Sequence, residues 1–317
     1  MTTDYRKLIP TPAVSVIIPT KDRSVLLPRA IESVLRQTFS SLELIVVDDG
    51  SQDDTERMCL SHAPDKGFRY RRSPPRGVSA ARNLGIEMAQ AELLAFLDSD
   101  DVWMPHKLER QLARLRTTQD KICHTEEIWI RHGRRVNPKK RHHKPEGWVF
   151  EACLPLCAIS PSSAMVHRSV FDDMGGFDES YAVCEDYELW LRLSTRYRVS
   201  LVTEPLIMKF GGHEDQLSRR YWGMDRWRVR ALYSRILDLT LRREWREAAF
   251  DEMQRKLKVL IQGYSKRGRE ATVRELADFG EAVARWLRGR EGPNGALQSA
   301  PPLPGSLNTL SESDAGK

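Results

Sequence analysis

The chain has 317 residues, 30% of them charged, and a formal net charge of +6 at pH 7. It is long enough for a full hydrophobic core and a further small module, and its basic balance favours an anionic ligand or surface. No apolar run approaches the roughly 18 residues that would span a bilayer, and residues 1–12 have no apolar signal core, which predicts a cytoplasmic protein. The five cysteines are odd in number and form no CxxC pair, which favours reduced thiols.

Short apolar segments, each followed at once by polar residues, predict buried strands. These segments are residues 14–18, 44–47 and 93–97, with a fourth at 206–210. Between them the apolar residues recur at helical spacing, over residues 24–37, over 78–90 and again after Pro105. Alternating strands and helices predict an α/β fold with a mostly parallel sheet covered by helices. In such a sheet the carboxyl ends of the strands meet at one edge, where ligands bind.

Acidic residues follow two of these strands at the predicted edge. Asp48 and Asp49 end the second strand, and Asp98, Asp100 and Asp101 follow the third. Asp98 and Asp100 are two apart on a turning chain, and such a carboxylate pair suits a hard divalent cation that also holds phosphate. A capped loop is the alternative for either cluster alone, because Asp and Ser favour turns and helix starts. Two clusters at one edge favour a metal-assisted ligand site.

Three segments resemble the nucleotide-sugar half of family 2 glycosyltransferases. They read VSVIIPTKDRSVLLPRAIESVLRQTF, LELIVVDDGSQDDT and RGVSAARNLGIEMAQAELLAFLDSDDVWMP, in the order of the family motifs. The resemblance covers roughly residues 12–215 and implies a GT-A type fold, with a mixed, mostly parallel sheet flanked by helices. It also implies Mg- or Mn-dependent transfer of a sugar, with inversion, from a nucleotide-diphosphate sugar to an acceptor hydroxyl. A UDP-sugar is the first choice of donor, and cell-envelope glycan or polysaccharide synthesis is the setting that the family suggests.

The resemblance places the nucleotide base at the end of the first strand. Pro19 and Thr20 match the turn that lines the base pocket. The family often has Tyr-Asn next, where this chain has Lys21 and Asp22, so the aromatic residue that stacks on the base in the family is absent from this position. Asp49 matches the acid that hydrogen-bonds the base, and an ionised carboxylate suits the imide N–H of uracil because it only accepts.

The resemblance places the diphosphate and the metal near the third strand. Arg82 and Asn83 match the family's ARN element, beside the phosphates and sugar. Asp98 and Asp100 match its DxD motif, in which Asp100 is the metal ligand and Asp98 contacts the sugar, the metal or a metal-bound water. His213 stands where relatives often carry a metal-side histidine, although a surface loop histidine is the equal alternative.

Glu185 and Asp186 begin a predicted helix and match the family's ED motif. A glycine-rich turn, GGFDE at residues 175–179, precedes them as it does in the family. The resemblance implies that Asp186 is the general base for the acceptor hydroxyl and that Glu185 positions acceptor or base. Helix capping is the plainer explanation, because acids at a helix N-terminus are favoured by the macrodipole.

The predicted organisation is a catalytic domain, a helical appendage and a tail. The catalytic domain spans residues 1–222, with a nucleotide-sugar half at about 12–125 and an acceptor half at about 126–222. Residues 223–290 form the appendage, whose tryptophans and arginines suit packing on the catalytic domain, a homodimer contact or docking at the inner membrane face. Residues 291–317 are rich in Pro, Gly and Ser and are expected to be disordered.

A basic run at residues 131–144 holds seven Lys and Arg residues and no acid. It is either a solvated hairpin or a surface for a phosphate-bearing glycan or lipid-linked acceptor, with Lys139, Lys140, Arg141 and Lys144 near the acceptor entrance. It has no interleaved aromatic residues and the chain has no nucleic-acid motif, so no nucleic-acid partner is expected.

Two other functions fit a parallel sheet with acids at one edge. A nucleotidyltransferase usually has a glycine-rich loop after the first strand, but residues 19–23 contain no glycine. The sequence also has no GxGxxG or Walker element. A non-catalytic sugar-binding or scaffold protein is the other alternative. Such a protein would not need to keep Asp98, Asp100, Glu185 and Asp186 together. Processive members of the family carry a Gln-x-x-Arg-Trp signature, which residues 216–222 match only with the wrong spacing. The sequence therefore predicts that sugars are added singly.

Overall fold

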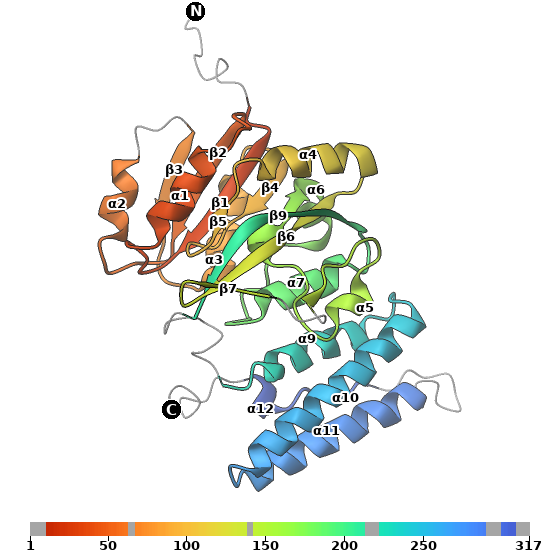
Figure 1. Cartoon of the computed structure of the whole chain (residues 1–317). Helices are drawn as coiled ribbons and strands as arrows, with labels where there is room; N and C mark the ends of the chain where they lie inside the picture. Colours follow the sequence, from red (N-terminus) through yellow and green to blue (C-terminus); the bar gives the residue numbers. More distant parts are fainter. Residues whose placement is uncertain (1–10, 63–66, 138–141, 213–221, 290–298, 309–317) are drawn as a thin grey trace, which may run out of the picture.

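The computed structural model describes residues 11–62, 67–137, 142–212, 222–289 and 299–308. Across these residues one nine-stranded mixed sheet forms the centre of the molecule, with helices on both of its faces (Figure 1). The strand order is β3-β2-β1-β4-β8-β6-β9-β5, and β7 pairs with β6. The predicted α/β class, with a mixed sheet flanked by helices, is confirmed.

The N-terminal half of the sheet is parallel. Its strands are β1 (Val14–Thr20), β2 (Leu42–Asp48), β3 (Phe68–Arg72) and β4 (Leu93–Phe96). The helices that connect them are α1 (Leu27–Leu35), α2 (Thr55–Ser61) and α3 (Val78–Met88). All seven residues of β1 are buried, as expected of a central parallel strand that is covered on both faces. The carboxyl ends of β1, β2 and β4 therefore meet at one edge.

The second half of the sheet is mixed. Its strands are β5 (Val102–Trp103), β6 (Ile122–Arg131), β7 (Arg134–Val136), β8 (Met165–His167) and β9 (Val199–Gly211). Its helical elements are α4 (Lys107–Thr118), α5 (Phe150–Cys153), the 3-10 turn η3 (Pro161–Ser163), α6 (Arg168–Met174) and α7 (Glu185–Leu193). β8 is antiparallel to both β4 and β6, and it thereby joins the two halves into one sheet.

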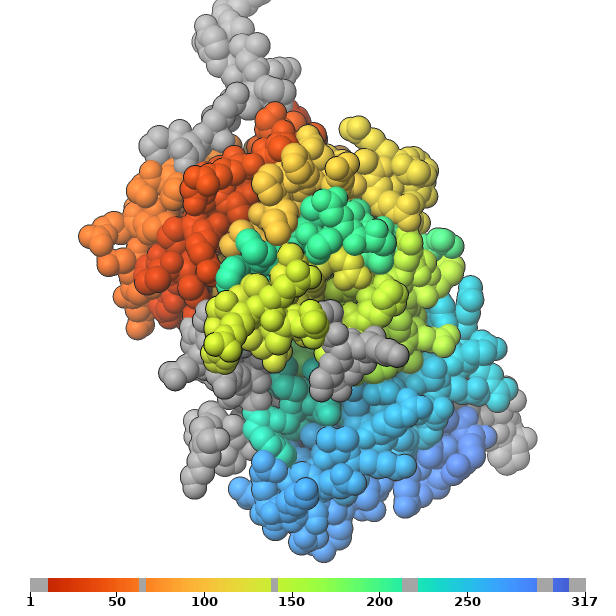
Figure 2. Space-filling view, in the orientation of Figure 1, coloured from red at the N-terminus to blue at the C-terminus, as the bar shows by residue number. Residues whose placement is uncertain are grey.

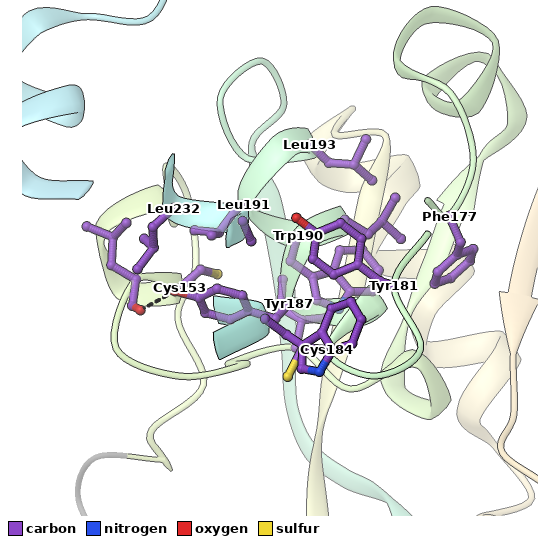
Figure 3. Close-up of a cluster of buried hydrophobic side chains, with 14 of the residues drawn as sticks. Cys153, Phe177, Tyr181, Cys184, Tyr187, Trp190, Leu191, Leu193 and Leu232 are labelled. Atoms are coloured by element: carbon purple, nitrogen blue, oxygen red, sulfur yellow. Dashed lines mark hydrogen bonds between the residues drawn. The ribbon is translucent and has the colours of Figure 1, made fainter. Parts of the chain in front are cut away.

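α7 lies at the centre of the largest hydrophobic cluster. Figure 3 shows Tyr187 and Trp190 of α7 together with Tyr181 from the preceding turn and Leu232 from a later helix. The Tyr187 hydroxyl donates a hydrogen bond to the Leu154 carbonyl at 2.6 Å. Because the helix is buried on several sides, its first turn, with Glu185 and Asp186, is held in a fixed position.

The C-terminal helices pack on the catalytic part of the chain. They are α9 (Asp225–Leu237), α10 (Arg243–Ser265) and α11 (Glu270–Arg288) (Figure 1). α9 packs on α7, α10 packs on α9 and α5, and α11 packs on α10. In the space-filling view these helices lie directly against the rest of the chain (Figure 2). The Trp245 ring stacks on Phe150 with centroids 5.1 Å apart. One hydrophobic cluster runs from Ile17 of β1 to Val283 of α11. These helices therefore share a core with the sheet.

The tryptophans of these helices face the protein interior. Trp227, Trp245 and Trp286 are only 4%, 8% and 7% exposed. Because these three side chains are buried, they are not available to dock on a membrane surface. Among the described helices none has a stretch long and apolar enough to cross a membrane.

Part of the expected tail has a defined place. Residues 299–308, which include the short helix α12 (Gly305–Asn308), lie against α9. The Tyr233 hydroxyl donates to the Pro301 carbonyl, and Leu307 is 2% exposed. This differs from the prediction of disorder over residues 291–317. The reason is that Leu303 and Leu307 bury apolar area in a segment whose prolines lose little backbone freedom on folding.

The basic run forms the β6–β7 hairpin and the chain that follows it. His132 and Gly133 make the turn with positive φ angles of 49° and 72°. Lys144 is 5% exposed, pairs with Glu127 at 3.0 Å and donates to the Ala158 carbonyl. Lys144 is therefore committed to buried Glu127, which needs a counter-charge, and its ammonium is not exposed to draw in an acceptor as predicted. The other three basic residues of that prediction lie outside the described residues.

Candidate active site

A cleft of about 870 Å³ opens at the carboxyl edge of β1, β2 and β4. Nine of the predicted site residues line it: Pro19, Thr20, Asp22, Asp49, Arg82, Asp98, Asp100, Glu185 and Asp186. The first turn of α7 and the start of α9 form the opposite wall. The sheet edge therefore brings the predicted donor residues and the ED motif into one space.

The end of the cleft that is predicted to receive the nucleotide is organised around Asp49. Its carboxylate accepts hydrogen bonds from the backbone N–H groups of Arg76 at 2.7 Å and Gly77 at 3.0 Å. Gly77 has φ +98°, a conformation that favours glycine, and it lets the chain turn into α3 under Asp49. A carboxylate has about four lone-pair sites, so Asp49 retains the capacity to accept from a bound base.

Residues at the end of β1 complete this end of the cleft. Thr20 is 4% exposed, and its buried Oγ1 has no hydrogen-bond partner among the described residues. Asp22 has φ +51°, and its carboxylate accepts from the Gln52 N–H at 2.7 Å. Asp22 thus fastens the loop after β1 to the loop after β2 while it also lines the cleft.

Arg82 joins the DxD motif to the ED motif. Its Nη1 donates to Glu185 Oε1 at 2.6 Å, and its Nη2 donates to Asp98 Oδ1 at 2.8 Å. Burial raises the pKa of Asp98, but the charges of Arg82 and Lys209, together with hydrogen bonding, outweigh burial and lower that pKa. Burial raises the pKa of Glu185, and the Arg82 charge offsets only part of that effect. Glu185 depends on this guanidinium for its counter-charge, and Asp98 shares it and has the Lys209 charge nearby as well.

A close helix–strand contact places Arg82 at the sheet edge. Gly85 lies on α3 near Arg82, and a Cβ at Gly85 would meet Ile17 Cγ2 at 2.4 Å. Only glycine allows this approach of α3 to β1. The short separation carries the guanidinium of the buried Arg82 between the two acidic motifs.

Asp100 is a carboxylate of the cleft whose only support among the described residues is the nearby charge of Lys209 and Arg23 and its own backbone N–H. No other residue of the described segments donates a hydrogen bond to its carboxylate. Burial and the nearby Asp98 charge raise the pKa of Asp100. Asp101, in contrast, accepts from Ser162 Oγ at 2.7 Å and from the Phe210 N–H at 3.1 Å, and burial raises its pKa to about 8. Asp101 therefore anchors the loop that presents Asp100.

The residues present fit a divalent cation. The described part of the chain holds no group of three or more His, Cys, Asp and Glu residues that could bind a metal ion by themselves. Asp100 nevertheless offers hard oxygen atoms without a competing partner, and Asp98 has a second oxygen beyond its bond to Arg82. Mg and Mn take such oxygen ligands and complete their shell with phosphate and water. His213, the third predicted ligand, lies outside the described residues.

Asp186, the predicted base, lines the cleft from the first turn of α7 and is partly exposed. Its Oδ1 accepts from the Tyr187 N–H at 2.7 Å, and its Oδ2 lies 3.2 Å from the Cys157 thiol. Cys184 enters the helix with φ +61°, which turns the chain so that both acids face the cleft. The arrangement can hold a carboxylate ready to accept a proton.

Asn83 is placed differently from the other predicted residues. It does not line the cleft; its Oδ1 accepts from the Phe177 N–H at 2.8 Å and its Nδ2 donates to the Phe177 carbonyl at 2.9 Å. A Cβ at Gly176 would meet Asn83 Oδ1 at 2.4 Å, which explains the second glycine of the GGFDE turn. Asn83 thus holds the turn that leads to α7.

The sequence reasoning missed several residues of the cleft. Lys209 comes from β9, and its ammonium lies 3.7 Å from Asp101 Oδ2. Burial opposes its charge, but the surrounding carboxylates raise the pKa of Lys209. The position of Lys209 within an otherwise apolar stretch of β9 could have indicated a functional lysine. Met224 and Trp227 line the cleft from α9, and nothing in their helical pattern distinguished them from core residues.

Comparisons with known proteins agree with this geometry. Residues 15–175 match the model of the family described as glycosyl transferase family 2. The chain belongs to this family. An uncharacterized glycosyltransferase of Rickettsia felis is 31% identical over 207 residues, which are 63% of this chain and 33% of that protein. The enzyme WfgD of Escherichia coli, named UDP-Glc:alpha-D-GlcNAc-diphosphoundecaprenol beta-1,3-glucosyltransferase, is 27% identical over 60% of this chain and 72% of that protein.

Solved structures show the same fold. TarS of S. aureus in complex with UDP superposes with a TM-score of 0.61 and 17% identity, over 88% of this chain and 81% of that chain. The mannosyltransferase PcManGT of Pyrobaculum calidifontis, in complex with GDP-Man and Mn2+, gives a TM-score of 0.59 and 16% identity over 84% of each chain. The fold is therefore the GT-A type. The chain spans only about a third of the length of the Rickettsia felis relative.

Proposed function

We propose that this chain transfers a sugar from a nucleotide-diphosphate sugar to an acceptor hydroxyl, in single additions and with inversion at the anomeric carbon. The observation that carries the proposal is the Arg82 bridge between Asp98 and Glu185, which holds the donor motif and the acceptor motif in one cleft. A nucleotidyltransferase has no evident use for a carboxylate such as Asp186 at the far wall. A scaffold protein has no use for an unpaired Asp100.

The donor lies along the carboxyl edge of the sheet. Asp49 and Thr20 receive the nucleotide, and a UDP-sugar is the first choice because a carboxylate accepts from the uracil imide. The diphosphate lies beside Asp98 and Asp100. Mg or Mn held by these two acids neutralises the charge of the leaving diphosphate. Lys209 lies near enough to add to the positive charge on that side.

Asp186 removes the proton of the acceptor hydroxyl. Its two oxygens are oriented by the Tyr187 N–H and the Cys157 thiol. The lone pairs that these contacts do not use are available to accept the proton of the acceptor hydroxyl. Glu185 stays paired with Arg82 and fixes the start of α7. A base on the wall opposite the diphosphate suits in-line attack, which inverts the anomeric carbon.

The acceptor is a glycan or a lipid-linked sugar. Support comes from the Escherichia coli relatives WfgD and WfaP, whose names give diphosphoundecaprenol-linked GlcNAc as their acceptor. We place the enzyme in cell-envelope glycan or polysaccharide synthesis, on the cytoplasmic side of the membrane. Contact with the membrane surface and pairing of two copies through the C-terminal helices belong to the same proposal.

Calorimetry on the purified chain tests the proposal. UDP-glucose, UDP-N-acetylglucosamine, dTDP-glucose and GDP-mannose are titrated with Mn and again with EDTA. We expect one donor to bind tightly and only with the metal. Incubation of that donor with neutral glycosides and analysis of the product anomer by NMR tests inversion. Absence of binding by all four donors in the presence of Mn would contradict the proposal.

A further inference from the structure

One face of α1 holds the backbone of the loop that carries Asp100. Arg29 and Ser33 are four residues apart on this helix, a spacing that puts both side chains on the same face. Arg29 Nη2 donates a hydrogen bond to the Asp100 carbonyl at 3.0 Å, and Ser33 Oγ accepts from the Trp103 N–H at 3.1 Å. α1 therefore contacts the loop at backbone atoms, which side-chain changes within the loop leave in place.

The Arg29 guanidinium is itself held by an aromatic ring. Its Cζ atom lies 4.1 Å from the ring centre of Phe210, near the end of β9, which is within the range of a cation–π contact. The Phe210 N–H in turn donates to Asp101 Oδ1 at 3.1 Å. Arg29 thus joins three separate parts of the fold, which are α1, the loop around Asp100 and the end of β9.

The other hydrogen bonds of this loop act at the residues on either side of Asp100. Ser162 Oγ accepts from the Asp98 N–H at 3.1 Å and donates to Asp101 Oδ2 at 2.7 Å. The Asp101 N–H also donates to the Asp98 carbonyl at 3.0 Å. Arg29 adds a bond at the backbone of Asp100 itself, and a bond from a charged donor is stronger than one from a neutral donor.

The direction of the Asp100 carboxylate depends on this backbone. Mg requires near-ideal octahedral geometry, so a ligand oxygen that is displaced binds the ion poorly. Residues that orient a metal ligand typically contribute between ten- and a hundredfold to the affinity for the metal, although they do not touch the ion. A contact that fixes the peptide of Asp100 therefore bears directly on the candidate metal site.

We propose that Arg29 is a positioning residue for the candidate metal site and that it acts through the backbone of Asp100. Arg29 does not line the cleft, so it has no direct contact with a nucleotide or a cation there. The inference rests on the proposed metal-dependent glycosyltransfer and adds a residue on α1 to its machinery.

Calorimetry on the purified full chain tests the inference without a transfer assay. The probes are UDP and GDP, each titrated with Mn and again with EDTA, and the nucleotide that binds is used throughout. The measured quantity is the metal-dependent gain, which is the Kd in EDTA divided by the Kd in Mn. Arg29→Met should lower this gain on the order of tenfold and leave the Kd in EDTA unchanged. A merely structural role would change both constants or neither.

Two variants control for charge and for the helix. Arg36→Met changes an arginine of the same helical segment whose side chain is 74% exposed and pairs with Glu32, and it should keep the full gain. Arg29→Lys keeps a cation and a donor at the critical position and should recover most of the gain. Loss of the gain in Arg36→Met as well would overturn the assignment to Arg29.

A double-mutant cycle tests whether Arg29 acts through Asp100. Asp100→Ala removes the ligand, so Arg29→Met should lower the gain no further in that background. An equal loss in both backgrounds would show that Arg29 acts by another route and would contradict the inference.

The outcomes separate this inference from the proposed function. If Mn strengthens the binding of neither nucleotide to the unchanged protein, the proposed metal dependence fails and the role of Arg29 fails with it. If Mn strengthens binding equally in the unchanged protein and in Arg29→Met, only the role of Arg29 is wrong. If Arg29→Met does not fold, Phe210→Leu removes the ring that holds the guanidinium. That variant should also lower the gain, and an unchanged gain would overturn the inference.

Discussion

The thiol of Cys157 lies 3.2 Å from Oδ2 of Asp186. Burial, together with the Asp186 charge, raises the pKa of Cys157 well above its usual range, so the thiol keeps its proton at neutral pH. The same sulfur is 3.1 Å from the Ile159 carbonyl, so the single S–H proton is shared between that carbonyl and Asp186. With the Tyr187 N–H on the other oxygen, both oxygens of the candidate base are oriented by neighbours.

Cys157 is therefore expected to position the base. Cys157→Ala removes a contact that orients Oδ2 of Asp186, so the base is less well placed for the acceptor hydroxyl. We expect kcat to fall on the order of tenfold with an unchanged donor KM. Cys157→Ser keeps a donor and should recover most of the rate. An Ala variant with the kcat of the unchanged enzyme would remove Cys157 from the mechanism.

Asp186→Asn separates binding from chemistry. The amide keeps the shape of the side chain but cannot accept the proton of the acceptor. Transfer should fall on the order of a hundredfold or more, from loss of general base catalysis, while donor affinity by calorimetry stays near that of the unchanged protein. Transfer at the full rate would show that another group is the base.

Asp100→Ala addresses the metal. Removing this oxygen ligand should abolish the Mn-dependent part of UDP binding, because the diphosphate charge is then poorly compensated. Asp49→Ala is the matched variant at the other end of the cleft, and it should weaken UDP binding with or without Mn. Both are measured by titration calorimetry. Unchanged UDP–Mn affinity in the two variants would contradict the assignment of donor and metal residues.

Arg82→Met should affect stability as well as activity. It leaves Glu185 and Asp98 without their shared counter-charge, and Glu185 is 7% exposed. Breaking a buried ion pair from one side costs about 3–5 kcal/mol, so urea denaturation should show a large loss. Arg82→Lys keeps the charge but not the two-pronged geometry and should lose less stability than activity. Equal midpoints for the Met variant and the unchanged protein would exclude this bridge.

Lys107 predicts a specific pH dependence of stability. Its side chain is fully buried, with its ammonium 3.9 Å from the Trp103 ring centre and 2.5 Å from Gln111 Oε1. Burial lowers the pKa of Lys107 from 10.5 to about 7. Between these two pH values the unfolded chain binds more protons than the folded chain, so the free energy of unfolding rises with pH.

Lys107→Met removes that dependence. Between pH 7 and 9 the unchanged protein should gain on the order of 2 kcal/mol relative to the variant, at about 1.4 kcal/mol for each pH unit. Urea titrations of both proteins across this range measure the difference. Parallel curves would show that Lys107 is charged in the folded protein at pH 9 as well.

The sequence was most informative where one strand carries its own signal. The buried runs of β1, β2 and β4 and the acids after them could be found because each lies within a few residues of chain. β8 has three residues, and β3 reads FRYRR, so neither has a recognisable apolar pattern. Their places depend on pairing with distant strands, which local patterns do not encode.

The contacts between site residues could not be predicted from the sequence for the same reason. Arg82 and Glu185 are 103 residues apart, and the close approach of α3 to β1 that joins them depends on Gly85. Asn83 follows Arg82 directly but points to the GGFDE turn, because successive helical residues face different directions. A motif identifies which residues gather at a site, and the backbone decides which of them face the ligand.

Because one hydrophobic core runs from β1 to α11, the C-terminal helices cannot be removed without exposing part of that core. A truncation after residue 222 would expose the apolar surface of α5 and α7 and remove Met224 and Trp227 from the cleft. The C-terminal helices are therefore not a detachable module that could be exchanged between enzymes without consequence. Substitutions in the first turns of α9 can, however, reshape one wall of the cleft and leave the acidic edge of the sheet unchanged. Under the proposed function, such substitutions would change the acceptor while the donor stays the same.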